Sequence, residues 1–152
     1  MNVGQYCKRA VVTVAPTADI AEAARLMRDE HVGFLVVVEG DVHTRTPLGV
    51  LTDRDIVLEV VAPGIDPRAL TVKDVMTREP LTASEEDDLQ DVMQGMRLAG
   101  IRRIPVVDER GGLAGIISAD DTIDVITGML CDLAGSIRNE QRQEWRTRQA
   151  VG

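Results

Sequence analysis

Two short segments, GVLTDRD at residues 49–55 and GIISADD at residues 115–121, share one pattern and decide the fold. In each segment a glycine and an apolar pair precede a hydroxyl residue, and an aspartate follows three positions after that hydroxyl. The apolar pair is typical of a buried strand, and the hydroxyl-x-x-acid spacing is typical of a helix start. Each segment therefore predicts a strand that leads directly into a helix.

The rest of the chain repeats around these two segments. At an offset of 69 positions, residues 3–39 align with residues 72–108 without a gap, and the offset becomes 66 at the segments quoted above. Identities are few, but the hydrophobic pattern agrees almost throughout, as where Met27 meets Met96. A period of this length indicates one supersecondary unit present twice.

Each copy predicts the element order β-α-β-β-α, an α/β (α+β) fold. Predicted strands lie at residues 11–14, 34–38, 48–51, 81–83, 104–107 and 113–117. Thr17 and Ser84 are good N-caps for the first helix of each copy, and the acidic run at residues 85–88 would form a first helical turn. The second helices are expected from about Asp53 to Ala62 and from about Asp120 through Leu130.

These elements divide the chain into two repeats and a tail. We expect a first repeat at residues 1–65, a second at 66–130 and a C-terminal helical tail at 131–152, with short lead-ins at residues 3–7 and 72–76. A unit of this size buries little core alone, so the repeats are expected to pack face to face with pseudo-twofold symmetry.

Composition excludes several classes of function. There are 17 basic and 25 acidic residues, a net charge of −8, which argues against broad nucleic-acid binding. Aromatic residues make up 2% of the chain, so a base-stacking platform is not expected. No apolar run is long enough for a membrane span and no secretion signal is visible, so we expect a cytoplasmic protein. Cys7 and Cys131 lack metal-site spacing, and no metal is expected.

Two further segments, VKDVMT at residues 72–77 and IRRIPVVD at residues 101–108, complete a family resemblance. With the duplicated closing segments, they make the chain resemble the CBS-domain family from about residue 3 to residue 129. The resemblance implies a stand-alone tandem pair, or Bateman module. In many members the cleft between the repeats binds adenosine-containing ligands, and such pairs commonly dimerise and act as regulators.

The repeated helix start suits a nucleotide on physical grounds. Unpaired N–H groups at a helix start favour phosphate, and the Thr52 and Ser118 hydroxyls can donate to the same oxygens. Asp55 and Asp121 present carboxylates able to accept both hydroxyl protons of a ribose. The same spacing also matches a capping box. An aspartate that only caps should cost about 1 kcal/mol of stability when replaced by alanine, without any effect on ligand response.

The resemblance also places an adenine slot along the strands and phosphate donors near it. The candidate wall residues are Val12, Val14, Val36, Leu81, Ala83 and Pro105, and the candidate donors are Arg54, Arg102 and Arg103. Ordinary core packing and exposed arginines are the competing interpretations. Gly33-Phe34 stands where the second copy has Arg102-Arg103, and Asp120 adds a charge beside Asp121. We therefore expect unequal sites, with the Thr52 site favoured.

The sequence favours a non-enzymatic sensor of AMP, ADP, ATP or an NAD-like ligand, bound as a regulator and not as an obligatory cofactor. We expect a homodimer, a regulated protein partner, and neither membrane nor nucleic acid as a partner. The alternative is a dimerising interaction module without nucleotide. A sparse apolar stripe in the tail supports it, with Leu130, Leu133, Ala134, Ile137 and Trp145. Trp145 would either anchor a contact with another chain or pack back on its own.

Overall fold

The computed structural model describes residues 1–40 and 45–150. Residues 41–44, inside the predicted loop between residues 39 and 47, lie outside the described residues, as do the last two residues of the predicted tail.

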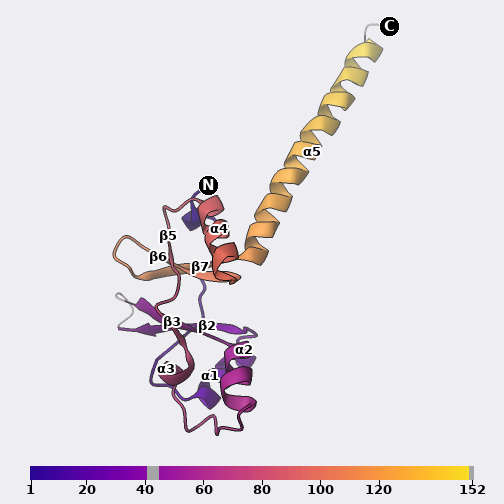
Figure 1. Cartoon of the computed structure of the whole chain (residues 1–152). Helices are drawn as coiled ribbons and strands as arrows, with labels where there is room; N and C mark the ends of the chain where they lie inside the picture. Colours follow the sequence, from indigo (N-terminus) through magenta and orange to yellow (C-terminus); the bar gives the residue numbers. More distant parts are fainter. Residues whose placement is uncertain (41–44, 151–152) are drawn as a thin grey trace.

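The predicted order β-α-β-β-α is confirmed in both copies (Figure 1). The first copy contains η1 (Val3–Gln5), β1 (Thr13–Val14), α1 (Ile20–Asp29), β2 (Phe34–Glu39), β3 (Thr46–Thr52), α2 (Asp53–Ile56) and the π-helical turn η2 (Val57–Val61). The second contains α3 (Val72–Val75), β4 (Thr77–Arg78), β5 (Ala83–Ser84), α4 (Leu89–Ala99), β6 (Arg103–Val107), β7 (Leu113–Ser118) and α5 (Ala119–Ala150).

Two sheets are stacked at the centre, with strand orders β1-β2-β3-β4 and β5-β6-β7. Helices α1, α2 and α3 lie beyond the first sheet and α4 beyond the second (Figure 1). Alternation along β2 sends Leu35 and Val37 into the core of the first repeat, while Val36 points to the other face and is fully buried. The inner faces of the two sheets therefore form the junction between the repeats.

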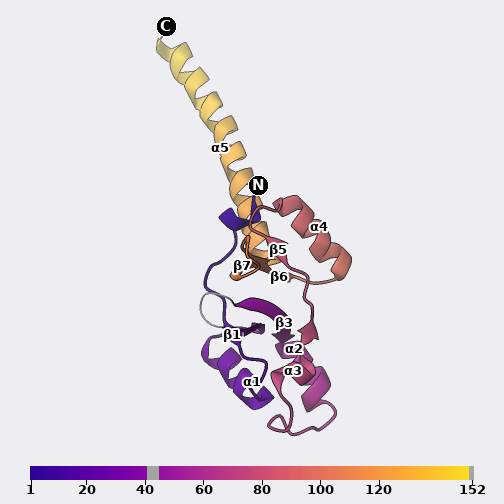
Figure 2. The same ribbon diagram turned by 90° about the vertical axis from the view of Figure 1, so that its left-hand side faces the viewer.

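The two lead-in segments are exchanged between the repeats. Val3 packs in the core of the second repeat and its N–H donates to the Asp87 carbonyl, whereas Val72 packs in the core of the first and donates to the Ala18 carbonyl. Lys8 then forms a two-way backbone bridge with Ile116. Figure 2 shows the N-terminus beside α4 and β5, far from α1. Each repeat is thus completed by a segment that precedes the other one.

The predicted N-caps of the first helices are wrong. Asp19 caps α1 by accepting from Glu22 N at 2.7 Å, and Asp88 caps α4 by accepting from Gln90 N at 2.9 Å. The acidic run at residues 85–88 precedes α4 and does not form its first turn. Asp88 of this run also binds the N-terminus, whose amine on Met1 lies 2.6 Å from the Asp88 carboxylate. Local capping signals do not reveal such a long-range partner.

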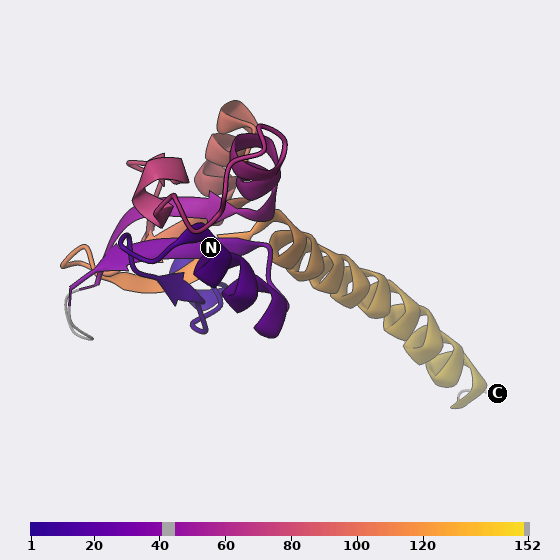
Figure 3. The same ribbon diagram turned by 90° about the horizontal axis from the view of Figure 1, so that it is seen from below.

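The last helix is one continuous element from Ala119 to Ala150, so the predicted boundary at residues 130 and 131 falls inside it. It leaves the body and extends away from both sheets (Figure 3). None of the helices in the described residues is long and apolar enough to cross a membrane.

Candidate functional site

Two pockets lie at the junction of the repeats. The first, the Thr52 pocket, has a volume of about 460 Å³ and is lined by residues that include Thr52, Arg54, Asp55, Thr77, Leu81, Arg102, Arg103 and Pro105. The second, the Ser118 pocket, has a volume of about 290 Å³ and is lined by residues that include Lys8, Val12, His31, Phe34, Arg103, Ser118, Asp120 and Asp121. Each pocket takes its helix start from one repeat and an opposite wall from the other.

The capping box predicted at Thr52 is present. Thr52 Oγ1 accepts from Asp55 N at 3.1 Å, and Asp55 Oδ2 accepts from Thr52 N at 2.9 Å. The strand β3 leads straight into α2, which places both side chains at the pocket wall. A carboxylate has more acceptor sites than this one bond uses. Capping and ligand binding by Asp55 are therefore compatible.

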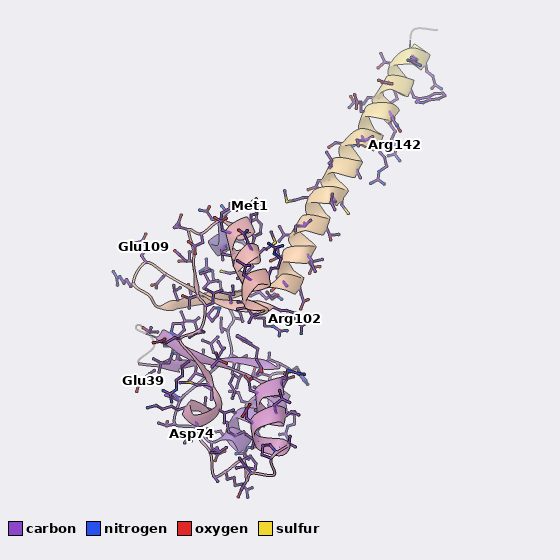
Figure 4. The ribbon with its side chains drawn as sticks, viewed as in Figure 1. Met1, Glu39, Asp74, Arg102, Glu109 and Arg142 are labelled. Atoms are coloured by element: carbon purple, nitrogen blue, oxygen red, sulfur yellow. The ribbon has the colours of Figure 1, made fainter. Side chains whose placement is uncertain are left out.

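Three arginines line the Thr52 pocket, and they come from both repeats. Arg54 is in the first turn of α2, while Arg102 and Arg103 precede and begin β6. Figure 4 labels Arg102 at the junction of the repeats, close to the start of α5. Arg103 stacks over the Phe34 ring with its guanidinium carbon 5.9 Å from the ring centroid, an attractive cation–π geometry. This stacking fixes one guanidinium at the boundary of the two pockets.

Two sequence differences between the copies, Gly33 against Arg102 and Asp53 against Ala119, lie next to each other in the structure. The Asp53 N–H donates to the Gly33 carbonyl at 3.1 Å, and at the equivalent place the Ala119 N–H donates to the Arg102 carbonyl at 2.8 Å. A Cβ added to Gly33 would lie 2.5 Å from an Asp53 carboxylate oxygen. In the second copy Ala119 has no carboxylate, so the partner position accepts an arginine side chain. Arg102 of the Thr52 pocket is therefore accommodated because Ala119, at the start of the other helix, carries no carboxylate.

The Ser118 pocket carries an ion pair, and among the residues that the structure describes Asp55 of the Thr52 pocket has no such partner. Lys8 Nζ lies 2.6 Å from Asp121 Oδ1, and Ser118 Oγ donates to the other oxygen of the same carboxylate. The Asp121 side chain is 16% exposed. Burial alone raises the pKa of its carboxyl, but the hydrogen bonds from Lys8 and Ser118 and the lysine charge outweigh burial and lower it. Hydrogen bonding to Asp121 raises the pKa of Lys8.

The repeat alignment shows why only one pocket has this ion pair. Lys8 is equivalent to Thr77 at the offset of 69. Both residues directly follow the exchanged lead-ins, where Lys8 bridges Ile116 and Thr77 pairs with Val50, and each lines the pocket of the repeat it joins. Sequence reasoning missed Lys8 and Thr77 as pocket residues because it kept each lead-in with its own repeat.

Most of the predicted site residues line one of the two pockets, and three do not. Val14 and Ala83 lie in the cores of the first and second repeats, and Val36 is fully buried between the sheets. The backbone N–H of Val36 is engaged by the Val12 carbonyl at 3.2 Å, so it is not available to a base edge. For these three residues the competing interpretation, core packing, describes the structure.

The glycines of the closing segments are needed for the exchanged lead-ins. A Cβ on Gly49 would lie 2.8 Å from the Thr77 carbonyl oxygen, and a Cβ on Gly115 would lie 2.8 Å from the Lys8 carbonyl oxygen. The close approach at these positions is made by backbone. The glycines thereby bring Lys8 and Thr77 to the pockets.

Comparison with known proteins identifies relatives for the whole tandem unit. The family model described as CBS domain matches residues 3–62 and 72–128. The CBS domain-containing protein YhcV of Bacillus subtilis is 39% identical over 126 residues, covering 83% of this chain and 84% of YhcV. An inosine-5'-monophosphate dehydrogenase of Korarchaeum cryptofilum is 35% identical, but the match spans only 25% of that enzyme.

Solved structures of similar proteins include two adenosyl complexes. The CBS domain protein PAE2072 from Pyrobaculum aerophilum, complexed with AMP, is 29% identical with a TM-score of 0.71, covering 80% of this chain and 89% of that one. The CBS domain pair of protein MJ0100, complexed with 5'-methylthioadenosine and S-adenosyl-L-methionine, is 26% identical with a TM-score of 0.72. That match covers 85% of this chain and 98% of the MJ0100 pair.

Proposed function

Because the chain belongs to the CBS domain family, we propose that it is a non-enzymatic regulatory module that senses an adenosine-containing ligand in the Thr52 pocket. One observation carries the proposal. The larger pocket combines the Asp55 carboxylate at a helix start with three arginines that come from both repeats, and the carboxylates of Asp53 and Glu79 also line it. A ligand bound there would connect the two repeats and so alter how they sit together.

The arginines supply the phosphate end of the proposed site. Arg54, Arg102 and Arg103 present planar donors suited to bidentate bonds with phosphate oxygens. Thr52 adds a hydroxyl at the start of α2. These groups favour a nucleotide over an uncharged nucleoside.

Asp55 and the opposite wall supply the nucleoside end. The Asp55 carboxylate is half-buried at the pocket wall and has acceptor capacity for the two hydroxyl groups of a ribose. Leu81 and Pro105 of the second repeat form an apolar wall suited to one face of a base. The complexes of PAE2072 with AMP and of the MJ0100 pair with adenosyl compounds support adenine as that base. AMP, ADP, ATP and an NAD-like dinucleotide are the proposed ligands.

The Ser118 pocket is proposed as the weaker site. Its aspartate is already engaged by Lys8 and Ser118, so a ribose must displace an ammonium group before it reaches the carboxylate. Among the residues that the structure describes, Arg103 is the one arginine that lines this pocket, against three in the Thr52 pocket. We expect one ligand to bind first at the Thr52 pocket, within a cytoplasmic regulator that passes the signal to a protein partner.

A ligand-binding experiment with matched variants tests the proposal. Isothermal titration with AMP, ADP, ATP, NAD and S-adenosylmethionine, on protein stripped of bound nucleotide, should find one ligand that binds wild type. Asp55→Ala should weaken that binding by about 2 kcal/mol, roughly thirtyfold, as expected for lost hydrogen bonds to a charged group. Asp121→Ala is the matched control and should change it little.

Two outcomes contradict the proposal. Equal losses in both aspartate variants would exclude the Thr52 pocket as the preferred site. Absence of binding by all five ligands would favour the alternative function, a module that only mediates protein contacts. In that case Asp55 acts only as a cap, and Asp55→Ala costs about 1 kcal/mol of stability.

A further inference from the structure

The Thr52 and Ser118 pockets are neighbours that share a wall. Gly33, Phe34 and Arg103 line both of them. Gly33 has no side chain, so the shared wall consists of the Phe34 ring and the Arg103 guanidinium that stacks on it. A molecule bound in either pocket therefore meets the same two side chains.

The pseudo-twofold relation between the repeats explains why this wall is a single pair. Phe34 and Arg103 are equivalent at the offset of 69. Phe34 pairs with Thr52 across β2 and β3, and Arg103 pairs with Ser118 across β6 and β7. The two side chains meet where the equivalent strands of the two repeats face each other. Because one of the pair is phenylalanine, the wall holds one guanidinium, where identical copies would supply either two or none.

This guanidinium has a different importance in each pocket. The Thr52 pocket also contains Arg54 and Arg102, whereas in the described part of the chain Arg103 is the one arginine that lines the Ser118 pocket. The lysine of the Ser118 pocket is already paired with its aspartate. Arg103 itself forms no ion pair with any residue that the structure describes, so its charge can serve either pocket.

One guanidinium cannot serve two nucleotides at once. It carries one positive charge, whereas a phosphate monoester carries nearly two negative charges at neutral pH. Two such groups at the same guanidinium would lie close enough to repel each other strongly. On the basis of the function proposed above, we propose that Arg103 couples the two pockets negatively. A phosphate-bearing ligand in the Thr52 pocket engages Arg103 and thereby lowers the affinity of the Ser118 pocket for a second ligand.

The coupling gives the chain a two-stage response to ligand. The first molecule fills the Thr52 pocket, and the second then needs a concentration about tenfold higher than the Ser118 pocket would need by itself. The effect is reciprocal, since a coupling free energy acts equally on both sites. Arg103 therefore widens the range of ligand concentration over which the chain responds, beyond the inequality that the Lys8 ion pair produces.

Separate signals from the two pockets test the coupling. In NMR titrations with AMP and with ATP, on protein stripped of nucleotide, the backbone amides of Thr52 and Ser118 report the occupancy of their own pockets. Asp55→Ala weakens the Thr52 pocket, so Arg103 stays available to the other one. Binding at the Ser118 pocket should then become at least fivefold tighter than in wild type. Independent pockets would show no change.

Two neighbouring arginines provide the matched variants. Arg103→Met keeps an unbranched apolar side chain against Phe34 but removes the guanidinium. In that background, Asp55→Ala should no longer alter binding at the Ser118 pocket. Arg102→Met is the control, because Arg102 lines only the Thr52 pocket. Combined with Asp55→Ala, it should still bind at the Ser118 pocket at least fivefold more tightly than wild type.

The contrary outcomes separate this coupling from the proposed function. If AMP or ATP fills the Thr52 pocket and Asp55→Ala leaves the Ser118 pocket unchanged or empty, the coupling is overturned and the proposed function stands. A gain at the Ser118 pocket that persists in Arg103→Met would overturn the role of Arg103. No shift of either amide in wild type, with both nucleotides, would overturn the proposed function together with the coupling.

Discussion

The Thr52 and Ser118 pockets have the same backbone arrangement, but Thr77 lines the first pocket where Lys8 lines the second. In both pockets a strand ends in a hydroxyl residue, an aspartate follows one helical turn later, and an exchanged lead-in crosses a glycine. The lead-in delivers Thr77 to the first pocket and Lys8 to the second. Duplication has kept the architecture, while Lys8 gives Asp121 an ion-pair partner that Thr77 cannot give Asp55.

That difference changes what each carboxylate can do. Asp55 has its capping bonds with Thr52 and lines a pocket with three arginines, whereas Asp121 is in contact with an ammonium group in a smaller pocket. A ligand at Asp121 must replace an existing ion pair. The comparison therefore predicts which changes affect both pockets equally and which convert one into the other.

The largest expected effect is common to both pockets. Gly49→Ala and Gly115→Ala should each destabilise the protein by about 1–3 kcal/mol, because the new Cβ would overlap the carbonyl oxygen of Thr77 or Lys8. Urea unfolding measures the loss. Gly128→Ala is the control, since nothing lies within 4 Å of its Cβ and the change should stabilise α5. A neutral result at Gly49 or Gly115 would show that the exchanged lead-ins can move away.

Exchanging the two lead-in residues should convert one pocket into the other. Lys8→Thr removes the ammonium from Asp121 and should raise ligand affinity at the Ser118 pocket roughly fivefold at most, because an exposed ion pair is weak. Thr77→Lys introduces an ammonium beside Asp55 and should weaken the Thr52 pocket by a similar amount. Calorimetric titration of both variants gives the affinities and the stoichiometry. Unchanged affinities in both would remove Lys8 as the cause of inequality.

Sequence patterns predicted the duplication and the element order because these depend on local periodicity, and the family resemblance supplied the wall and arginine residues. They did not predict the exchange of lead-ins, since nothing local to Val3 or Lys8 indicates which repeat the segment completes. The error at the helix caps is local: Asp19 and Asp88 are also good N-cap residues, and each lies directly before its helix, closer than Thr17 or Ser84. The apolar stripe of the tail was visible in the sequence, but its exposure along a projecting helix required the structure.

The same ion pair predicts a difference in acid stability. The folded-state pKa of Asp121 is lowered, so the unfolded chain binds more protons in acid and stability rises with pH. This contribution is present above the unfolded value of about 3.9 and is lost as the pH falls through the lower folded pKa. Lys8→Thr should reduce this loss, as urea unfolding between pH 5 and pH 2 can measure. An identical pH profile for wild type and Lys8→Thr would show that the ion pair adds nothing in solution.

The smallest expected effect concerns the ends of the first helices. His31 and Gly100 are equivalent at the offset of 69, and both have positive φ, 55° and 65°. A left-handed residue other than glycine is strained by about 1–2 kcal/mol, although glycine loses more entropy on folding. His31→Gly should therefore stabilise the protein by roughly 0.5 kcal/mol, and Gly100→Ala should destabilise it by about 1 kcal/mol. Thermal unfolding of both variants checks the pair. If His31→Gly destabilises instead, the imidazole makes a contact in the Ser118 pocket that outweighs the backbone strain, and His31 joins Lys8 among the residues that distinguish the two pockets.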